Sequence, residues 1–545
     1  MSRVEGASVE EALDHLVNQF ADPLSFLREL IQNSIDAGSQ HIDVRFEKQP
    51  GQDGECVMVI HVDDFGEGMD REIIDSRLTR LFSSGKDGDL TKIGKFGIGF
   101  SSVFAIQPDA VCVDTTRGGE NWRVLFRKDR SFVRIERDEP IEGTKIRLIK
   151  AVPEAAFEDY RTRAESVVRY WCKHVEVEVT FDGEVINEPF DLDLRVKVFH
   201  HEPGTDIVAG YARGEATFRG FYNKGLTLLE SDDSGVPRVS FKVSSRYLEH
   251  TLTRDRVIED ANYRKAMSLV DGLIAGPLIE RLFELLDEAV RTEGENLSRA
   301  RYLQELAAWH LARGTDLPAS VGDRAVLRSV DGAPLGLAAC RRAAAASRLL
   351  VESGVSPLTD ALAALGYVIV SQMSDGGGLL RTLCGGEPPH ARHRFCLPLP
   401  VASEDETLRW VPLRDAAADL LGKSDVRIAS LELGRLAYEG SGVGSWPVVT
   451  VRRLGEVTPL AEALTLGTSL LSKKRVLVVS SDHPTVQGLI GMARTEPELA
   501  ALVLAKLVLL MTKHGPAVDA ELASPALNAT LGKLAVERRC TRLGF

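Results

Sequence analysis

The spacing of apolar residues in the first half of the chain changes repeatedly between a helical and a strand-like period. Segments in which apolar residues alternate with polar ones or run together, bounded by Gly and Asp, predict strands at 41–47, 57–62, 111–114, 122–127, 132–136 and 144–149. Between residues 24 and 37 apolar side chains recur at helical spacing instead (Leu24, Leu27, Leu30, Ile31, Ile35). These patterns predict an α+β fold in which helices cover one face of a sheet.

The remainder of the chain predicts fewer and longer elements. A strand near 239–243 and an amphipathic helix over 263–292 are expected to close a second domain. Beyond residue 301 the composition shifts towards Ala, Leu and Arg, and the pattern predicts helical stretches at 337–365 (interrupted near Pro357) and 484–513, with a buried strand at 475–480. Asp482, shortly before Pro484, is expected to cap the helix that follows, and a catalytic Asp482-His483 pair is the alternative.

The length of 545 residues exceeds what one hydrophobic core accommodates, so several domains are expected. We expect an N-terminal α/β sandwich at 1–185, an α/β middle domain at 186–300 and a mixed α/β C-terminal region at 301–545, to which no role is assigned. The second boundary falls where the composition changes.

Composition narrows the class of protein. No apolar run approaches the roughly 20 residues of a membrane span, and the first residues do not resemble a signal peptide, so we expect a cytoplasmic protein without a membrane partner. The net charge of -13 argues against non-specific binding to nucleic acid. The seven cysteines show no C-x-x-C spacing, which favours buried free thiols over a disulfide framework or a zinc site.

Three polar residues of the helix predicted at 24–37 carry the first candidate chemistry. Glu29, Asn33 and Asp36 are spaced i, i+4 and i+7 and therefore share the face opposite the apolar stripe. A carboxylate and a carboxamide one turn apart supply a base for an attacking water and an oxygen ligand for Mg²⁺. A solvated helix face is the alternative interpretation.

A second group follows the apolar run 57–62, which ends in Asp63-Asp64-Phe65-Gly66-Glu67-Gly68-Met69. A buried strand thus delivers Asp64, which can accept a hydrogen bond from the exocyclic amine of adenine. Gly66 and Gly68, followed by Met69, allow the backbone to lie flat against a base. An ordinary turn is the alternative.

The third and fourth groups are a glycine-rich segment and a Gly-Thr pair. Glycine-rich backbone that opens a helix directs free N–H groups at phosphates, and the spacing here is neither that of a Walker loop nor that of a dinucleotide fingerprint. The Gly-Thr pair starts an alternating strand, where the hydroxyl of Thr144 can reach the edge of a base. The residues of the glycine-rich segment are Gly94, Phe96, Gly97, Ile98, Gly99 and Phe100.

These groups, in this order, resemble the GHKL superfamily, named for gyrase, heat-shock protein 90, histidine kinase and MutL. The resemblance implies a Bergerat-type sandwich that binds and hydrolyses ATP with Mg²⁺. It implies that Glu29 activates water, Asn33 binds Mg²⁺, Asp64 selects adenine, the loop 94–99 holds phosphates and Thr144 supports the base. The segment 71–92 would be the nucleotide lid. Either Lys86 or Lys92 is a candidate phosphate contact, and a mobile surface lysine is the alternative for each.

Four segments bear on the branch of the superfamily. Residues 26–37 and 95–100 resemble heat-shock protein 90 chaperones, whereas the layout of 38–44 is closer to MutL and the topoisomerases. Residues 247–255 resemble the loop of the chaperone middle domain that sends an arginine to the γ-phosphate. By this resemblance Arg254 is a catalytic candidate, with Arg256 as its substitute and a surface ion pair as the alternative.

The leading hypothesis is an ATP-dependent molecular chaperone, or a chaperone-like conformational ATPase, that acts on unfolded client proteins. The resemblance to this family also implies a homodimer. The alternative is a GHKL clamp ATPase in DNA repair, nucleic-acid transactions or bacterial defence, which the acidic charge opposes. A histidine kinase is disfavoured because no room precedes Glu29 for a phospho-acceptor domain, and a regulatory ATP binder without turnover is disfavoured by the presence of Glu29.

Overall fold

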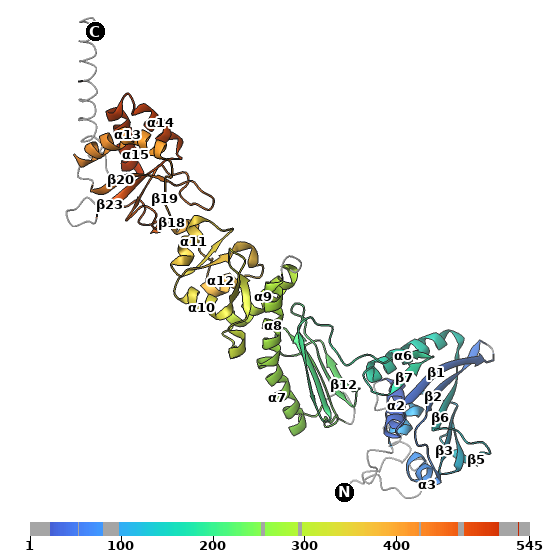
Figure 1. Cartoon of the computed structure of the whole chain (residues 1–545). Helices are drawn as coiled ribbons and strands as arrows, with labels where there is room; N and C mark the ends of the chain where they lie inside the picture. Colours follow the sequence, from blue (N-terminus) through green and yellow to red (C-terminus); the bar gives the residue numbers. More distant parts are fainter. Residues whose placement is uncertain are drawn as a thin grey trace, which may run out of the picture. The chain divides into compact units, whose positions relative to one another are not determined.

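The computed structural model describes residues 22–52, 54–79, 98–251, 257–292, 297–423, 427–466, 474–511 and 532. The chain divides into two compact units, 1–278 and 279–545 (Figure 1). Both units contain helices and sheets, so the predicted α+β class is confirmed. The division into domains at 185 and 300 stays a prediction.

An eight-stranded sheet organises the first part of unit 1, and it contains all six strands predicted there. Its order is β5-β4-β3-β6-β2-β1-β7-β8, antiparallel throughout except for the parallel pair β1 and β7. The bounds are β1 His41–Pro50, β2 Glu55–Asp64, β3 Ala110–Arg117, β4 Glu120–Arg127, β5 Phe132–Glu136, β6 Thr144–Pro153, β7 Glu178–Phe181 and β8 Glu184–Val185.

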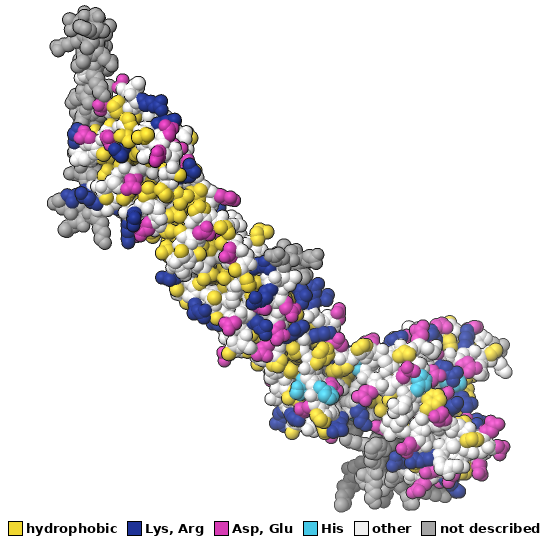
Figure 2. All heavy atoms as spheres, viewed as in Figure 1, with side chains coloured by type: hydrophobic (Ala, Val, Ile, Leu, Met, Phe, Trp, Pro, Cys, Tyr) yellow, Lys and Arg dark blue, Asp and Glu magenta, His cyan; other side chains and the backbone are white. Residues whose placement is uncertain are grey.

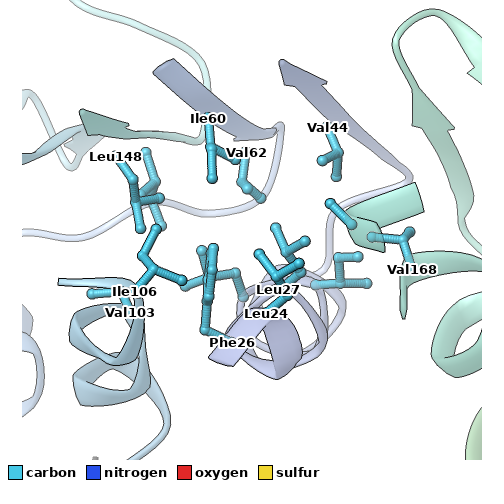
Figure 3. Packing of buried hydrophobic residues seen from close by; sticks show 14 of the residues in the cluster. Leu24, Phe26, Leu27, Val44, Ile60, Val62, Val103, Ile106, Leu148 and Val168 are labelled. Carbon is cyan, nitrogen blue, oxygen red and sulfur yellow. The ribbon is translucent and has the colours of Figure 1, made fainter. Parts of the chain in front are cut away.

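One face of this sheet is covered by helices, which share its hydrophobic core. The main covering helices are α2 (Phe26–Asp36) and α6 (Phe157–Cys172). Figure 3 shows Leu24 and Leu27 facing Ile60 and Val62 of β2, as the period of two in β2 predicts. Shorter elements complete this layer: η1 Pro23–Ser25, α3 Arg71–Ile73, η2 Ile74–Leu78, α5 Ile98–Ser101, η4 Ser102–Ile106 and η5 Glu154–Ala156.

A five-stranded sheet of order β12-β11-β13-β10-β9 forms the rest of unit 1 and packs on α7 (Ala261–Ala275). The predicted single helix over 263–292 is wrong, because α7 ends before Gly276 and α8 (Pro277–Arg291) begins after it. Proline has no N–H and suits a first helical turn, which explains the break. The strands are β9 Lys197–Glu202, β10 Thr205–Tyr211, β11 Arg219–Asn223, β12 Leu226–Ser231 and β13 Val239–Ser245.

Unit 2 is built from small sheets and from helices of 6 to 19 residues. Its largest sheet has the order β19-β20-β23-β21, and α13, α14 and α15 pack against β20 and β23 in one core cluster. The helices are α9 Leu297–Ala312, α10 Leu337–Ala345, α11 Pro357–Ala364, α12 Leu379–Cys384, α13 Glu404–Gly422, α14 Pro484–Met492 and α15 Pro497–Met511. The short turns are η6 Ala319–Val321, η7 Gln372–Ser374 and η8 Ala391–His393.

The strands of unit 2 test two further predictions. The strand predicted at 475–480 is confirmed as β23. The predicted helical stretch 337–365 is wrong in its middle, where β16 lies between α10 and α11. The strands are β14 Ala325–Arg328, β15 Pro334–Gly336, β16 Leu349–Glu352, β17 Val368–Ser371, β18 Phe395–Cys396, β19 Leu399–Pro400, β20 Ile428–Arg435, β21 Val448–Val451, β22 Thr458–Pro459 and β23 Arg475–Ser480.

Three smaller predictions also have an outcome. Asp482 is not the cap of α14, because His483 occupies the N-cap position, and the Asp482 carboxylate lies 3.5 Å from Arg435 Nε. The six cysteines in the described ranges are free, and five of them are buried. Among the described helices, none has the length and apolar character needed to cross a bilayer.

Replacing Leu27 by alanine should test the packing of α2. Leu27 is fully buried, so Leu27→Ala should lower the free energy of unfolding by about 2–5 kcal/mol, because it leaves a cavity between helix and sheet. Ile135→Ala, at a side chain of β5 that is 48% exposed, should change it by less than about 1 kcal/mol. Chemical denaturation of both variants measures this, and equal effects would contradict the packing described.

Candidate functional site

Helix α2 places its three polar residues in different surroundings. Asn33 and Asp36 are exposed, whereas Glu29 is only 4% exposed, which the helical pattern alone did not predict. The backbone of Gly99 explains part of this burial, since a Cβ atom on Gly99 would lie 3.2 Å from Glu29 Oε2. The helix group of Glu29 and the glycine-rich segment are therefore in contact. The carboxylate of Glu29 lies between them, largely shielded from water.

The carboxylate of Asp64 ends β2 and joins three segments of the chain. Its Oδ1 accepts hydrogen bonds from the backbone N–H of Gly66 at 3.0 Å and of Thr144 at 3.1 Å. Its Oδ2 accepts one from the hydroxyl of Ser34 at 3.1 Å. Burial raises the pKa of Asp64, and these hydrogen bonds oppose that rise. A buried acceptor is thus fixed where the first, second and fourth groups meet.

The two glycines after Asp64 are required by close contacts within the protein. A Cβ atom on Gly66 would lie 2.6 Å from the carbonyl oxygen of Ala37, at the end of α2. Gly68 has φ +68°, and its Cβ atom would lie 2.1 Å from the carbonyl oxygen of Thr116. The N–H of Met69 donates to Thr115 Oγ1 at 2.8 Å. These contacts position the turn; contact of the glycines with a base stays a prediction.

Thr144 lies at the start of β6, in the centre of the sheet. It is paired with Asp64 on one side and with Thr115 on the other. The hydroxyls of Thr115 and Thr144 are 3.2 Å apart, and both side chains are buried. Gly143 has φ +66°, and a Cβ atom there would lie 2.1 Å from the carbonyl oxygen of Asp64, so only glycine allows β6 to begin at this point.

Part of the predicted site lies outside the described residues, namely Lys86, Gly94, Phe96, Gly97 and Arg254. Ile98 begins α5, but its side chain also lies outside the description. Phe100 is 7% exposed and its ring centroid lies 5.4 Å from that of Phe126, so its side chain belongs to the hydrophobic core. The phosphate-binding role of 94–99 therefore stays a prediction.

The structure adds residues that the sequence interpretation did not single out. Ser34 links Asp64 to the carbonyl oxygen of Leu30, and Thr115 contacts both Met69 and Thr144. Arg28 is buried against the ring of Trp171, with its guanidinium carbon 4.2 Å from the ring centroid, and burial lowers its pKa to about 10. Of these residues, only Ser34 could have been noticed in the sequence, because it lies between Asn33 and Asp36 in the first group.

The side chains present fit a Mg²⁺ ion that keeps most of its water and phosphate ligands. In the described ranges, no three or more His, Cys, Asp or Glu side chains gather as a metal site would require. An exposed carboxamide at Asn33, one helical turn from Glu29, is compatible with Mg²⁺ because this ion commonly takes one or two protein ligands beside phosphates.

Residues 23–162, which contain this geometry, match the family described as "Histidine kinase-, DNA gyrase B-, and HSP90-like ATPase". This segment belongs to that ATPase family. The predicted superfamily is thereby confirmed for residues 23–162, which include α2, the turn after Asp64 and β6.

The ATPase segment also matches curated chaperones. The chain is 35% identical over 188 residues to "Chaperone protein HtpG" of Anaplasma phagocytophilum and 30% identical over 188 residues to that of Ehrlichia ruminantium, in both cases over 29% of each chain. It is 29% identical over 222 residues to the HtpG of Chlorobaculum tepidum, over 35% of each chain. The matched region thus spans about a third or less of these relatives.

Gly143→Ala should test the close approach of β6 to Asp64. We expect it to lower the free energy of unfolding by at least about 1 kcal/mol more than Gly118→Ala, because both residues have a positive φ but only the first meets backbone. Around Gly118, at φ +61°, a Cβ atom would meet nothing within 4 Å. Thermal and chemical unfolding of the pair give the comparison, and equal losses would show that φ alone accounts for both.

Proposed function

We propose that the chain is a heat-shock-protein-90-like, ATP-dependent molecular chaperone or chaperone-like conformational ATPase. The observation that carries the proposal is the convergence on Asp64. A buried carboxylate acceptor lies between Ser34 of α2, the N–H of Gly66 and the N–H of Thr144. Such an acceptor can select the exocyclic amine of adenine, and the match of residues 23–162 to an ATPase family supports this assignment.

In the proposed reaction Glu29 is the general base that takes a proton from the attacking water. Its burial beside Gly99 keeps bulk water from the carboxylate and places it next to the end of the glycine-rich loop. Bound Mg²⁺ would neutralise charge on the phosphates, with Asn33 as its protein ligand. Lys86 and the backbone of 94–99 would contact phosphates, and Arg254, which follows β13 in the sequence, would stabilise the transition state.

The chaperone assignment rests on the relatives named HtpG and on the second sheet that follows the ATPase segment. Client binding, dimer formation and a cytoplasmic location are proposed from the same relatives. The alternative is a clamp ATPase that acts on nucleic acid or in bacterial defence. Figure 2 shows acidic and basic side chains interspersed over the visible face, which together with the net charge of -13 favours the chaperone.

Asp64→Asn should separate the folding role of this position from its binding role. Asparagine keeps an acceptor for the N–H groups of Gly66 and Thr144, and its amide can donate to Ser34 Oγ, so stability should change by less than about 1 kcal/mol. The same amide presents a donor to the amine of adenine, and ATP binding should fall by at least about 100-fold. Calorimetric titration with ATP, beside unfolding curves, tests both expectations. Parent-like ATP affinity in a folded variant would show that Asp64 does not select adenine.

Glu29→Ala should leave ATP binding intact and reduce turnover by at least about 100-fold, because it removes the proton acceptor. Phosphate release and suppression of aggregation of a heat-denatured client protein should be recorded in the same samples, with and without ATP. Protection that depends on ATP and changes in Glu29→Ala supports the chaperone. Turnover by the parent without any effect on the client would favour the clamp ATPase instead.

A further inference from the structure

Lys224, at the tip of the β11–β12 hairpin in the second sheet, contacts the first group of the ATPase segment. Its Nζ lies 3.2 Å from Oδ1 of Asp36, near the end of α2. Asp36 is one helical turn beyond Asn33 and two turns beyond Glu29 on the same face. A cation from a different sheet therefore reaches the helix that carries the proposed base and metal ligand.

The hairpin is held in this position by contacts other than the ion pair. Leu226 is 5% exposed and belongs to the hydrophobic core cluster of the ATPase segment. Thr227 Oγ1 donates to the carbonyl oxygen of Tyr170 at 2.6 Å. Gly225 passes so close to the segment after α6 that a Cβ atom there would lie 2.1 Å from the carbonyl oxygen of His174. The tip is thus anchored, and the place of Lys224 is set by packing.

Buried polar contacts continue this junction along the second sheet. Lys173, just after α6, lies 3.0 Å from Glu230 of β12, which also accepts a hydrogen bond from Tyr222 at 2.5 Å. Lys242 of β13 lies 2.9 Å from Nε2 of His174. These groups are largely removed from water, so breaking their hydrogen bonds is costly. They therefore hold the second sheet in one position relative to the end of α6. The junction between the end of α6 and the second sheet is therefore fixed by directional polar contacts as well as by apolar packing.

The backbone at the tip does not favour lysine. Lys224 and Gly225 are the two central residues of the turn and have φ +49° and +81°. Turns of this kind favour asparagine, aspartate or glycine, and a lysine with positive φ costs roughly 1 kcal/mol. An ion pair as exposed as this one, with side chains 57% and 42% exposed, offsets little of that cost by itself. The ammonium group of Lys224 contributes more if Asp36, its partner, belongs to a ligand-binding site, because the charge then also acts on the bound ligand.

We propose that Lys224 is a positioning residue of the ATP site, supplied by the second sheet, so that nucleotide binding and docking of the β11–β12 hairpin stabilise each other. The inference rests on the proposed ATP site. Lys224 holds the carboxylate of Asp36 in place and puts a positive charge next to the helix that meets an anionic ligand. Binding free energies are reciprocal, so a nucleotide that is bound more tightly with the hairpin docked must also tighten the docking.

The test compares Lys224→Glu, Lys224→Arg and Lys265→Glu in the full chain. Lys265 is the matched control, because it is also an exposed lysine of the second sheet's layer in an ion pair, with Glu202 at 3.0 Å. Lys224→Glu should weaken ATP binding at least about fivefold, while Lys224→Arg and Lys265→Glu should stay within about twofold of the parent. KM and kcat are measured separately, and the loss is expected mainly in KM.

A second measurement follows the hairpin itself. Addition of ATP to the parent should slow hydrogen exchange of the backbone amides in the hairpin 219–231, and Asp64→Asn should abolish this protection. If ATP binds the parent but leaves this exchange unchanged, or if Lys224→Glu binds ATP as the parent does, the inference is wrong and the ATPase proposal stands. Equal losses in Lys224→Arg and Lys224→Glu would also overturn it, since charge would not be the cause. If the parent binds no ATP, both proposals fall.

Discussion

A carboxylate that is buried at the end of a central strand needs hydrogen-bond donors, and three elements of the first unit are arranged around that requirement. Asp64 meets it with the hydroxyl of Ser34 and two backbone N–H groups. Each donor fixes an element: α2, the glycine turn and the start of β6. The glycines at 66 and 143 follow from the same constraint, because a side chain at either would separate the parts that the carboxylate joins.

The parts of this site that could be predicted from the sequence are those with strong local signals. A buried run of β-branched and apolar residues predicts β2 and therefore the place of Asp64, and helical spacing predicts α2 with Glu29 on its polar face. Thr115 could not be found in this way, because its contact with Thr144 depends on β6 lying between β2 and β3. That order is a non-local property, and no periodicity within one segment encodes it. The contact of Ser34 with Asp64 depends on the packing of α2 beside the end of β2. The burial of Glu29 likewise depends on Gly99, which lies far away in the sequence.

The errors in the helix predictions have local physical causes. The break at Gly276 and Pro277 divides a stretch whose amphipathic pattern continues through it, so periodicity alone predicts one helix. In the alanine-rich stretch after Leu337, Ser347 takes φ +55°, and the next apolar residues form a four-residue strand, β16. An apolar run of that length is compatible with either element, and only its pairing with β17 decides.

The strand order of the large sheet bears on how the protein is made. Strands β2 and β3 are synthesised before β6, yet β6 pairs with both and separates them in the finished sheet. Chains leave the ribosome from the N-terminus, so β2 and β3 cannot take their final places in the sheet until β6 has been synthesised. Asp64 has all three of its described donors only after Thr144 has been synthesised. A nascent chain that ends before Thr144 lacks one of the three donors to Asp64, so the junction of α2, the glycine turn and β6 is completed by a late strand.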